Sequence, residues 1–307
     1  MYHIIVNPSS KSGMGRKKWK TLKNILLQEM VTYNVQFTKG HMDAYKCARK
    51  LTSKIQSGLL HLIVVGGDGT INEVLNGIMD FDNTVLTYLP TGSSNDLARD
   101  MNRFADADDF LFHLKQDKNR IKNMDYGIST FKGGQRKFAV SCGIGFDADV
   151  CEQAFVSKLK RFLNIFRLGK LTYGVIALKL LLAYRPVSAD IYLDDNPKPL
   201  HIDKLLFAAA MNHRYEGGGF LFAPEADATD GILDLCVAGD LSLPRILYLL
   251  PLALKGKHVG HKGIHNLKAK KIEIKVSKPL TVHTDGEICG KHDTLVLSCE
   301  NNRLQYI

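Results

Sequence analysis

Short apolar runs alternate with amphipathic segments through residues 1–125 of this 307-residue chain. In chain order we expect a strand at 3–6, a helix at 16–30, a strand at 33–38, a helix at 43–56 and strands at 60–65 and 84–89. This alternation is typical of a mainly parallel sheet with helices on both faces. The sequence therefore predicts a three-layer α/β domain over residues 1–125.

The pattern changes after Asp125 to β-rich runs separated by Gly, Asn and Asp. We expect strands at 138–142, 189–193, 205–210, 232–237, 271–276 and 280–283, with helices near 152–166, 171–184 and 244–254. Such a pattern indicates an antiparallel, β-rich second domain over residues 126–294. Ligand sites favour the cleft between two such halves, so we expect the chemistry there.

The distribution of charge and the cysteines restrict the expected binding partners and cellular location. The formal net charge is +10, with basic patches at residues 1–40, 153–189 and 255–278. These patches attract nucleotide phosphates, nucleic acid or an anionic lipid surface, or they are solvated basic faces. Six cysteines without a CxxC pair, and no secretory signal, predict a cytoplasmic protein. The longest apolar stretch, 171–183, is too short to cross a membrane.

A glycine-rich loop, Gly66-Gly67-Asp68-Gly69-Thr70, follows an apolar strand and precedes a helix-like segment. Glycines let the backbone approach a ligand, and a helix N-terminus favours an anion, so the loop predicts phosphate binding. A tight turn is the alternative. Asp68 favours the phosphate interpretation, because a carboxylate in such a loop suits Mg²⁺ carried by a nucleotide.

Two further strand ends carry loops of the same kind. One is Asn7-Pro8-Ser9 with the following Ser and Gly residues, and the other is Thr91-Gly92-Ser93-Ser94-Asn95-Asp96. A helix cap is the alternative for the second loop. Three converging loops predict a nucleotide site. Neither the G-x-G-x-x-G dinucleotide fingerprint nor the Walker loop is present.

With these motifs the chain resembles the bacterial diacylglycerol kinase family, soluble lipid kinases related to sphingosine kinases and more distantly to NAD kinases. The resemblance rests on five parts of the sequence besides Asn7-Pro8. They are the loop 66–70, Asn72-Glu73, the loop 89–96, the segment 227–231 and the segment 283–287. It implies an ATP-binding α/β domain, a β-sandwich-like lipid-substrate domain and a cleft between them. It also implies that residues 295–307 return to the first domain.

Roles for individual residues follow from the resemblance alone. It makes Asp285 the general base and Glu287 part of a Mg²⁺–water network. It adds Asp68, Asp96 and Asp125 to the carboxylates around the nucleotide. For a structural Mg²⁺ it implies Asp227, Asp230 and the carbonyl of Ile232, where a simple Asp-Gly turn is the alternative. Lys11 stands where the family often has glycine.

Residues 155–170 have a helical apolar stripe with basic residues around it, and such a helix lies on an anionic membrane or packs on the second domain. We therefore expect an ATP- and Mg²⁺-dependent diacylglycerol kinase, associated peripherally with the inner membrane face. Open alternatives are a kinase for a sphingoid base, phosphatidylglycerol or polyprenol, an NAD kinase, and a nucleotide- or lipid-binding regulator. Nucleic acid is not an expected partner, and the chain is a monomer or a homodimer.

Overall fold

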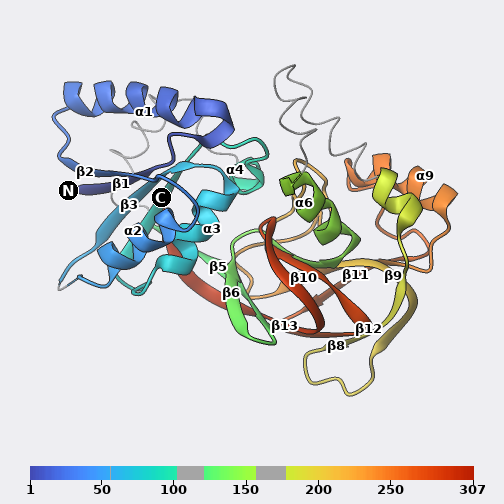
Figure 1. The fold of residues 1–307 in the computed structure, drawn as a ribbon. Helices are drawn as coiled ribbons and strands as arrows, with labels where there is room; N and C mark the ends of the chain where they lie inside the picture. The colour runs from blue at the N-terminus through green and yellow to red at the C-terminus, as the bar shows by residue number, and fades with distance from the viewer. Residues whose placement is uncertain (56, 102–120, 157–177) are drawn as a thin grey trace.

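The computed structural model describes residues 1–55, 57–101, 121–156 and 178–307 (Figure 1). Its N-terminal half contains β1 (Tyr2–Val6), α1 (Ser10–Gln28), β2 (Tyr33–Phe37), α2 (Asp43–Thr52), β3 (Leu60–Gly66), α3 (Asp68–Gly77), β4 (Thr84–Pro90) and α4 (Asp96–Met101). The four strands pair in parallel in the order β4-β3-β1-β2. The predicted strands are thereby confirmed to within a residue or two.

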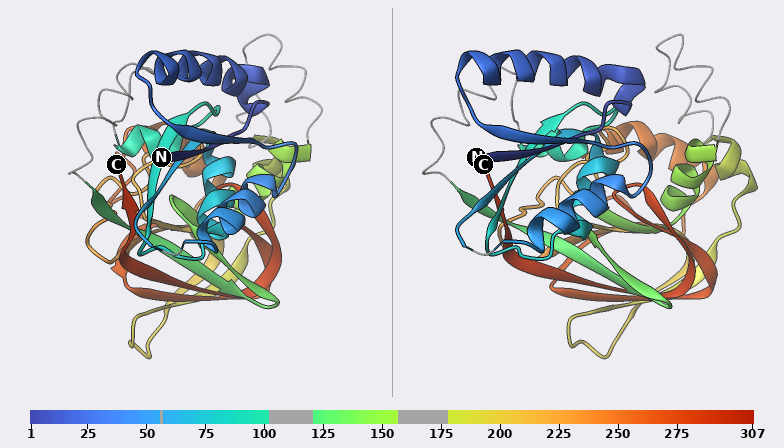
Figure 2. Two further views of the ribbon diagram at one scale, coloured as in Figure 1. Left: turned by 90° about the vertical axis from the view of Figure 1, so that its left-hand side faces the viewer. Right: turned by 60° about the vertical axis from the view of Figure 1, so that its left-hand side comes forward.

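Alternate residues of these strands pack on opposite helical layers, as the pleat of a strand requires. On one face Ile4 and Val6 of β1 contact Trp19, Leu22 and Leu26 of α1. The neighbouring Ile5 joins the opposite cluster, built with the apolar sides of α2 and α3. Figure 2 shows α1 above the sheet and α2 and α3 beneath it. The three-layer α/β prediction is confirmed.

The C-terminal half is β-rich. It contains β5 (Lys122–Phe131), β6 (Gly134–Phe138), β7 (Ser141–Gly145), α6 (Phe146–Val156), β8 (Val187–Leu193), β9 (Leu200–Met211), β10 (Leu233–Gly239), α9 (Leu243–Ala253), β11 (Ile264–Ala269), β12 (Lys271–Thr284) and β13 (Glu287–Tyr306). All pairings within this half are antiparallel. Its strands enclose a core that includes Phe138, Leu205, Leu235, Ile274 and Leu297. This is the expected sandwich-like arrangement.

The long strand β13 connects the two halves. Most of it pairs with β12 and β5, whereas Gln305 and Tyr306 at its end pair in parallel with β4. The pairing makes one continuous hydrogen-bonded path from β11 to β2. The cleft between the halves is therefore closed along one side by shared backbone.

Several predicted boundaries are wrong for identifiable reasons. The strand expected at 138–142 is broken after Phe138 and resumes at Ser141, because the N–H groups of Ala139, Val140 and Ser141 turn toward one carboxylate, that of Asp285. The strands expected at 271–276 and 280–283 are one strand, β12, with an irregular register between Lys275 and Leu280. The helix expected at 43–56 ends at Thr52.

Most of the two helices expected at 152–166 and 171–184 lies outside the described residues. In the part that is described, α6 begins at Phe146, six residues before the expected start, and residues 178–183 are helical. Among the described residues no helix is long and apolar enough to cross a membrane.

Candidate active site

A cavity of about 520 Å³ lies between the two halves. Its N-terminal side is lined by Asn7, Ser9, Ser10, Lys11, Thr38, Lys39, Gly40, His41, Ala44, Gly67, Asp68, Gly69, Thr70, Glu73, Gly92, Ser93, Ser94 and Asp96. Its C-terminal side is lined by Val140, Ser141, Cys151, Glu216, Gly217, Asp285, Gly286 and Glu287. All three predicted phosphate loops and the predicted 285–287 motif thus meet at one cavity.

Direct hydrogen bonds tie the three strand-end loops together. The Asn7 amide donates to Thr70 Oγ1 at 3.0 Å, which joins the β1 loop to α3. The hydroxyls of Ser10 and Thr91 lie 2.6 Å apart, which joins the β1 loop to the β4 loop. Parallel strands bring their carboxyl ends to the same edge of a sheet, and these bonds set the loops in register there.

Glycine is needed where two of these loops cross. A Cβ on Gly92 would lie 2.7 Å from the Cα of Gly67, a distance that side chains do not adopt. The Asn95 side chain closes the same loop by accepting the Gly92 N–H at 2.7 Å, with Asn95 itself in a left-handed conformation. The crossing presents backbone rather than side chains to the cavity, as phosphate loops do.

Asp68 lies at the N-terminus of α3, beside the carboxylates of Asp96 and Asp285. Its Oδ2 accepts the Asp96 backbone N–H at 3.4 Å, and its buried Oδ1 has no hydrogen-bond partner among the described residues. Burial, followed by the negative charges of Asp96 and Asp285, raises the pKa of Asp68 to about 7. A carboxylate in this position is suited to hold a cation or a proton.

Asp285 occupies a turn between β12 and β13 in which it and Gly286 both have positive φ. Its Oδ1 accepts the N–H groups of Val140 at 2.8 Å and Ser141 at 3.0 Å. Its Oδ2 accepts the Ala139 N–H and the Asn72 side-chain amide, each at 2.8 Å. Four donors occupy the lone pairs of both oxygens, so the carboxylate is held rigidly in one orientation.

Asn72 carries this contact across the cleft, because it belongs to α3 while Asp285 belongs to the C-terminal half. Its Oδ1 accepts a hydrogen bond of 2.8 Å from Arg136 Nη2, and its side chain is fully buried. The interaction of Asn72 with Asp285 therefore fixes the late acidic turn against the glycine-rich loop.

Glu287 lies two residues beyond Asp285 and faces the glycine-rich loop. Its Oε1 is 2.6 Å from the point where a Cβ on Gly69 would be, so a side chain at position 69 would displace the Glu287 carboxylate. No hydrogen bond from the described residues engages the Glu287 carboxylate, whereas both carboxylate oxygens of Asp285 accept hydrogen bonds. Glu287 is partly exposed and lines the cavity.

Six residues predicted for the nucleotide site do not line the cavity, namely Pro8, Gly66, Asn72, Thr91, Asn95 and Asp125. Asp125 is buried on β5, where it accepts the N–H groups of Gly231 at 2.7 Å and Asn302 at 2.6 Å. Glu73 does line the cavity, but its carboxylate accepts the N–H groups of Met42 and Ala44 at the start of α2. These four hydrogen bonds are structural supports of the loops.

The segment predicted to hold a structural cation forms a compact loop. Asp227 Oδ1 accepts from the backbone and hydroxyl of Thr229, and Asp230 Oδ1 accepts the Ile232 N–H at 2.9 Å. Both carboxylates are exposed, and the second oxygen of each has no hydrogen bond within the described part of the chain. Asp125 supports the same loop through Gly231.

The motifs missed several residues that line the cavity. Thr38, Lys39 and His41 come from the connection after β2, which has no glycine-rich signature. Ser141 and Glu216 come from segments that are distant in sequence. Glu216 directly precedes three consecutive glycines, Gly217 to Gly219, a local signal that could have drawn attention to it. Lys11 was noted only as a departure from a pattern. It adopts φ +43 and places a cationic side chain at the loop where phosphates are expected.

A parallel α/β sheet whose phosphate-type loops face fixed carboxylates of a β-sandwich defines a two-domain phosphotransferase. Residues 1–127 match the diacylglycerol kinase catalytic domain, and residues 140–305 match the YegS C-terminal NAD kinase beta sandwich-like domain. The chain belongs to the bacterial diacylglycerol kinase family, which makes it an ATP-using lipid kinase.

Relatives align along most of the chain. YtlR of Bacillus subtilis, whose name gives lipid kinase as a provisional activity, is 29% identical over 94% of this chain and 94% of its own length. The diacylglycerol kinase of the same organism is 29% identical over 94% of this chain and 89% of its own. A crystal structure described as a diacylglycerol kinase from Bacillus anthracis has a TM-score of 0.69 at 19% identity, covers 100% of this chain and 96% of that one, and supports the fold.

Proposed function

We propose that this kinase transfers the γ-phosphate of ATP to the free hydroxyl of diacylglycerol and so produces phosphatidic acid. The observation that carries the proposal is the Asn72–Asp285 hydrogen bond of 2.8 Å, which holds the late acidic turn against the glycine-rich loop. Phosphoryl transfer needs the phosphate donor and the acceptor hydroxyl to be aligned. This hydrogen bond holds the acidic turn next to the loop proposed to bind the donor phosphates. The names of several relatives support diacylglycerol as the acceptor.

The triphosphate binds at the three strand-end loops. The N-terminus of α3 and the crossing of Gly67 and Gly92 offer backbone there, and Lys11 and Lys39 supply positive charge. Mg²⁺ accompanies the nucleotide and neutralises charge on its phosphates. Asp68 and Asp96 are the residues that would hold it, and the partnerless buried oxygen of Asp68 fits a hard cation.

Glu287 acts as the general base on the acceptor hydroxyl, while Asp285 orients the turn. The distinction follows from hydrogen bonding, because a carboxylate that already accepts four donors has no lone pair left for a proton. Glu287 lines the cavity and no hydrogen bond within the described residues engages its side chain. This assignment moves the base two residues along from the one that the resemblance implies.

A structural Mg²⁺ would be held by Asp227, Asp230 and the carbonyl of Ile232. The uncommitted carboxylate oxygens of the two aspartates supply the hard ligands that this ion prefers. Because the same loop is anchored to Asp125 through Gly231, the ion would stabilise the junction of β5 with the C-terminal half.

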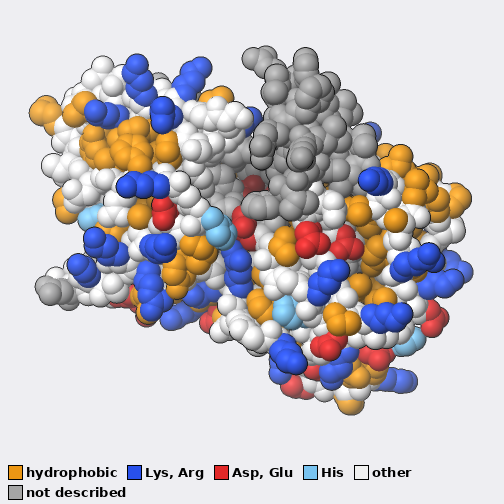
Figure 3. Space-filling model, viewed as in Figure 1, with side chains coloured by type: hydrophobic (Ala, Val, Ile, Leu, Met, Phe, Trp, Pro, Cys, Tyr) orange, Lys and Arg blue, Asp and Glu red, His pale blue; other side chains and the backbone are white. Residues whose placement is uncertain are grey.

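The protein works at the surface of an anionic membrane as a peripheral protein on the cytoplasmic side. The basic helix expected at 155–170 lies largely outside the described residues. Helix α9 provides another candidate surface for binding the membrane. Leu247, Tyr248 and Leu254 are 44%, 58% and 50% exposed, and Lys255 and Lys257 follow them in sequence (Figure 3). Exposed apolar side chains beside lysines are typical of interfacial binding.

The membrane part is tested with Leu247→Ser combined with Tyr248→Ser. We expect weaker sedimentation with vesicles of phosphatidylglycerol and phosphatidylcholine, and unchanged activity on a soluble short-chain acceptor. Equal sedimentation of variant and wild type would reject α9 as the membrane surface. Size-exclusion chromatography with light scattering on the same preparations distinguishes a monomer from a homodimer.

The function itself is tested by transfer of labelled γ-phosphate from ATP to a panel of acceptors in mixed micelles. The panel contains diacylglycerol, a sphingoid base, phosphatidylglycerol, a polyprenol and NAD, which covers the alternative kinases. We expect labelled phosphatidic acid, and loss of the signal in Glu287→Gln, the variant of the proposed base, with its melting temperature measured alongside. Label on another acceptor would replace diacylglycerol, and label on none would favour a nucleotide- or lipid-binding regulator.

A further inference from the structure

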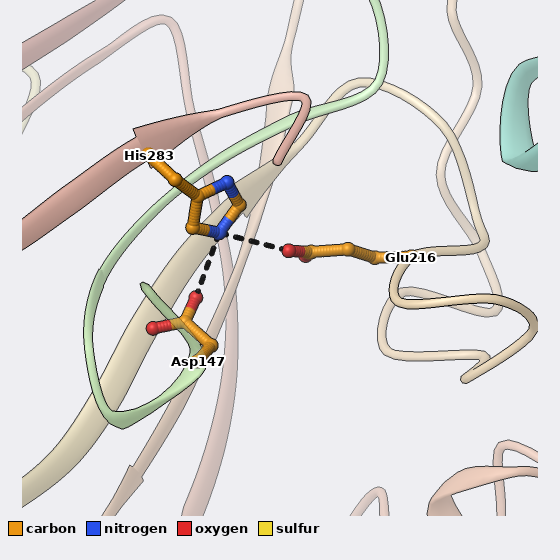
Figure 4. Close-up of side chains that lie close together, drawn as sticks. All are labelled: Asp147, Glu216 and His283. Carbon is orange, nitrogen blue, oxygen red and sulfur yellow. Dashed lines mark hydrogen bonds and ion pairs between the residues drawn. The ribbon is translucent and has the colours of Figure 1, made fainter. Parts of the chain in front are cut away.

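A buried cluster of Asp147, Glu216 and His283 lies directly behind the acidic turn. The three side chains come from the start of α6, the connection after β9 and the end of β12. His283 Nε2 lies 2.9 Å from Glu216 Oε1 and 3.2 Å from Asp147 Oδ2 (Figure 4). Of the three, only His283 belongs to a sequence motif, the segment 283–287, which assigned it no role, and the phosphoryl-transfer step described above does not use the cluster.

The other ring nitrogen of His283 decides what the cluster is. Nδ1 accepts the N–H of Gly286 at 3.2 Å, so it carries no hydrogen and the ring hydrogen is on Nε2. A metal at Nε2 would need that lone pair and would move the hydrogen to Nδ1, against the Gly286 N–H. Although the three ligand atoms lie within 4.8 Å of one another, the cluster is therefore a hydrogen-bonded triad.

The triad fixes the position of Glu216, and the segment that carries Glu216 is anchored to the nucleotide half. The Gly218 N–H donates to Asp96 Oδ2 at 2.8 Å, and His213 Nδ1 lies 2.8 Å from Asp100 Oδ2. Glu216 is thus held from both sides of the cleft.

Two buried polar atoms at this end of the cavity have no hydrogen-bond partner among the described residues. They are Oε2 of Glu216, a residue 8% exposed, and Oγ of Ser141, a residue 0% exposed. Both residues line the cavity next to Asp285. A buried polar atom without a partner destabilises the protein, so a ligand that supplies the missing hydrogen bonds binds more tightly for it.

Acidic side chains line both ends of the cavity, with Asp68, Glu73 and Asp96 in the nucleotide half and Glu216, Asp285 and Glu287 at the other end. Among the described residues, the lysines that line it, Lys11 and Lys39, come from the nucleotide half, so the other end has no lysine or arginine to offset its acids. Burial raises the pKa of Glu216, which favours a carboxyl group able to donate as well as accept. An anionic head group would be repelled at this end, while an uncharged hydroxyl or ester group could pair with both free atoms.

We propose that Glu216, positioned by His283 and Asp147, forms with Ser141 the subsite that binds the uncharged, oxygen-rich head group of the lipid acceptor and rejects anionic head groups. This rests on the proposed function, which it deepens by naming the residues that select the acceptor. Glu216 and Ser141 are binding residues, and His283 and Asp147 are positioning residues.

The test compares dioctanoylglycerol with dioctanoyl phosphatidylglycerol in neutral detergent micelles. We expect Ser141→Ala to raise the KM for dioctanoylglycerol about 10-fold, the loss of one buried hydrogen bond, with the KM for ATP unchanged. Glu216→Gln should lower the preference for the neutral over the anionic acceptor about 10-fold in kcat/KM. Glu225→Gln, an exposed glutamate outside the cavity, is the matched control and should change neither value.

His283→Gln tests the positioning role through the same KM split, and a Zn²⁺ titration of the wild type tests the triad. One Zn²⁺ bound by wild type and lost in His283→Gln would overturn the triad. Unchanged acceptor KM and preference in folded Ser141→Ala and Glu216→Gln would reject the subsite alone. A wild type that phosphorylates no lipid would reject the proposed function and the subsite with it. Melting temperatures establish folding, and Ser141→Ala, the smallest change, is decisive if Glu216→Gln unfolds.

Discussion

The two walls of the cavity are built on different principles. The nucleotide wall is formed by loops that cross at Gly67 and Gly92 and present backbone, with lysines at their edge. The opposite wall is formed by side chains, and Asp285 alone accepts four hydrogen bonds. Hence the first wall tolerates changes of side-chain chemistry but not added bulk, and the second tolerates neither loss nor displacement of a carboxylate.

The largest effect should come from the carboxylate wall. We expect Glu287→Gln to lower kcat by about 10²- to 10⁴-fold, the usual contribution of a general base, while ATP affinity stays near the wild-type value. Steady-state kinetics with a fluorescent-nucleotide binding assay checks this. If Asp285→Asn loses kcat as strongly without a fall in melting temperature, Asp285 is the base and the assignment of Glu287 is wrong.

The nucleotide wall should respond to bulk. Gly92→Ala places a methyl group 2.7 Å from the Cα of Gly67, so the loops must separate, and we expect the KM for ATP to rise on the order of 100-fold. Gly134→Ala is the control, because its added Cβ would meet only ordinary contacts, with Phe131 at 3.6 Å. Equal ATP KM values for the two variants would contradict the crossing as a binding element.

Asp68 lies in the nucleotide wall, but like the residues of the opposite wall it acts through its carboxylate. The effect of this carboxylate on the free energy of unfolding should depend on pH. Because its pKa is raised to about 7, the folded state binds more protons than the unfolded state between about pH 4 and 7. The stabilisation from that proton is complete below pH 4 and lost as pH rises through 7.

Without Mg²⁺, Asp68→Asn should therefore raise the free energy of unfolding by on the order of 4 kcal/mol at pH 8 and by about 1.5 kcal/mol at pH 5. Urea unfolding at the two pH values measures the difference. A gain that is equal at both would mean that Asp68 is ionised throughout.

The smallest effect should come from Lys11, an exposed side chain at the edge of the nucleotide wall. Lys11→Met keeps the length but removes the charge, and we expect a rise in the KM for ATP of roughly 3-fold that shrinks in high salt. Kinetics at two ionic strengths measures it. A salt-independent change would show that Lys11 acts through its strained backbone, at φ +43, instead of its charge.

Local signals determined much of the fold. Apolar runs in β1, β3 and β4 are buried strands because they pack helices on both faces, and such strands carry few polar residues. The strand break at Ala139 and Val140 had no local signal, since both residues are apolar and favour continuing the strand. A carboxylate more than 140 residues away, that of Asp285, turns their N–H groups aside.

By itself the sequence determined the three phosphate loops and the late acidic motif, because glycines after apolar strands and a D-G-E turn have local physical requirements. Only the tertiary structure decided how the carboxylates share the work. Whether Asp285 is saturated, Glu287 uncommitted or Glu216 held by His283 depends on contacts between residues 67 to 213 positions apart. Hydrogen bonds of that range leave no trace in the local sequence pattern. On them rests the proposed division between Asp285, which orients the turn, and Glu287 and Glu216, which react with and recognise the acceptor.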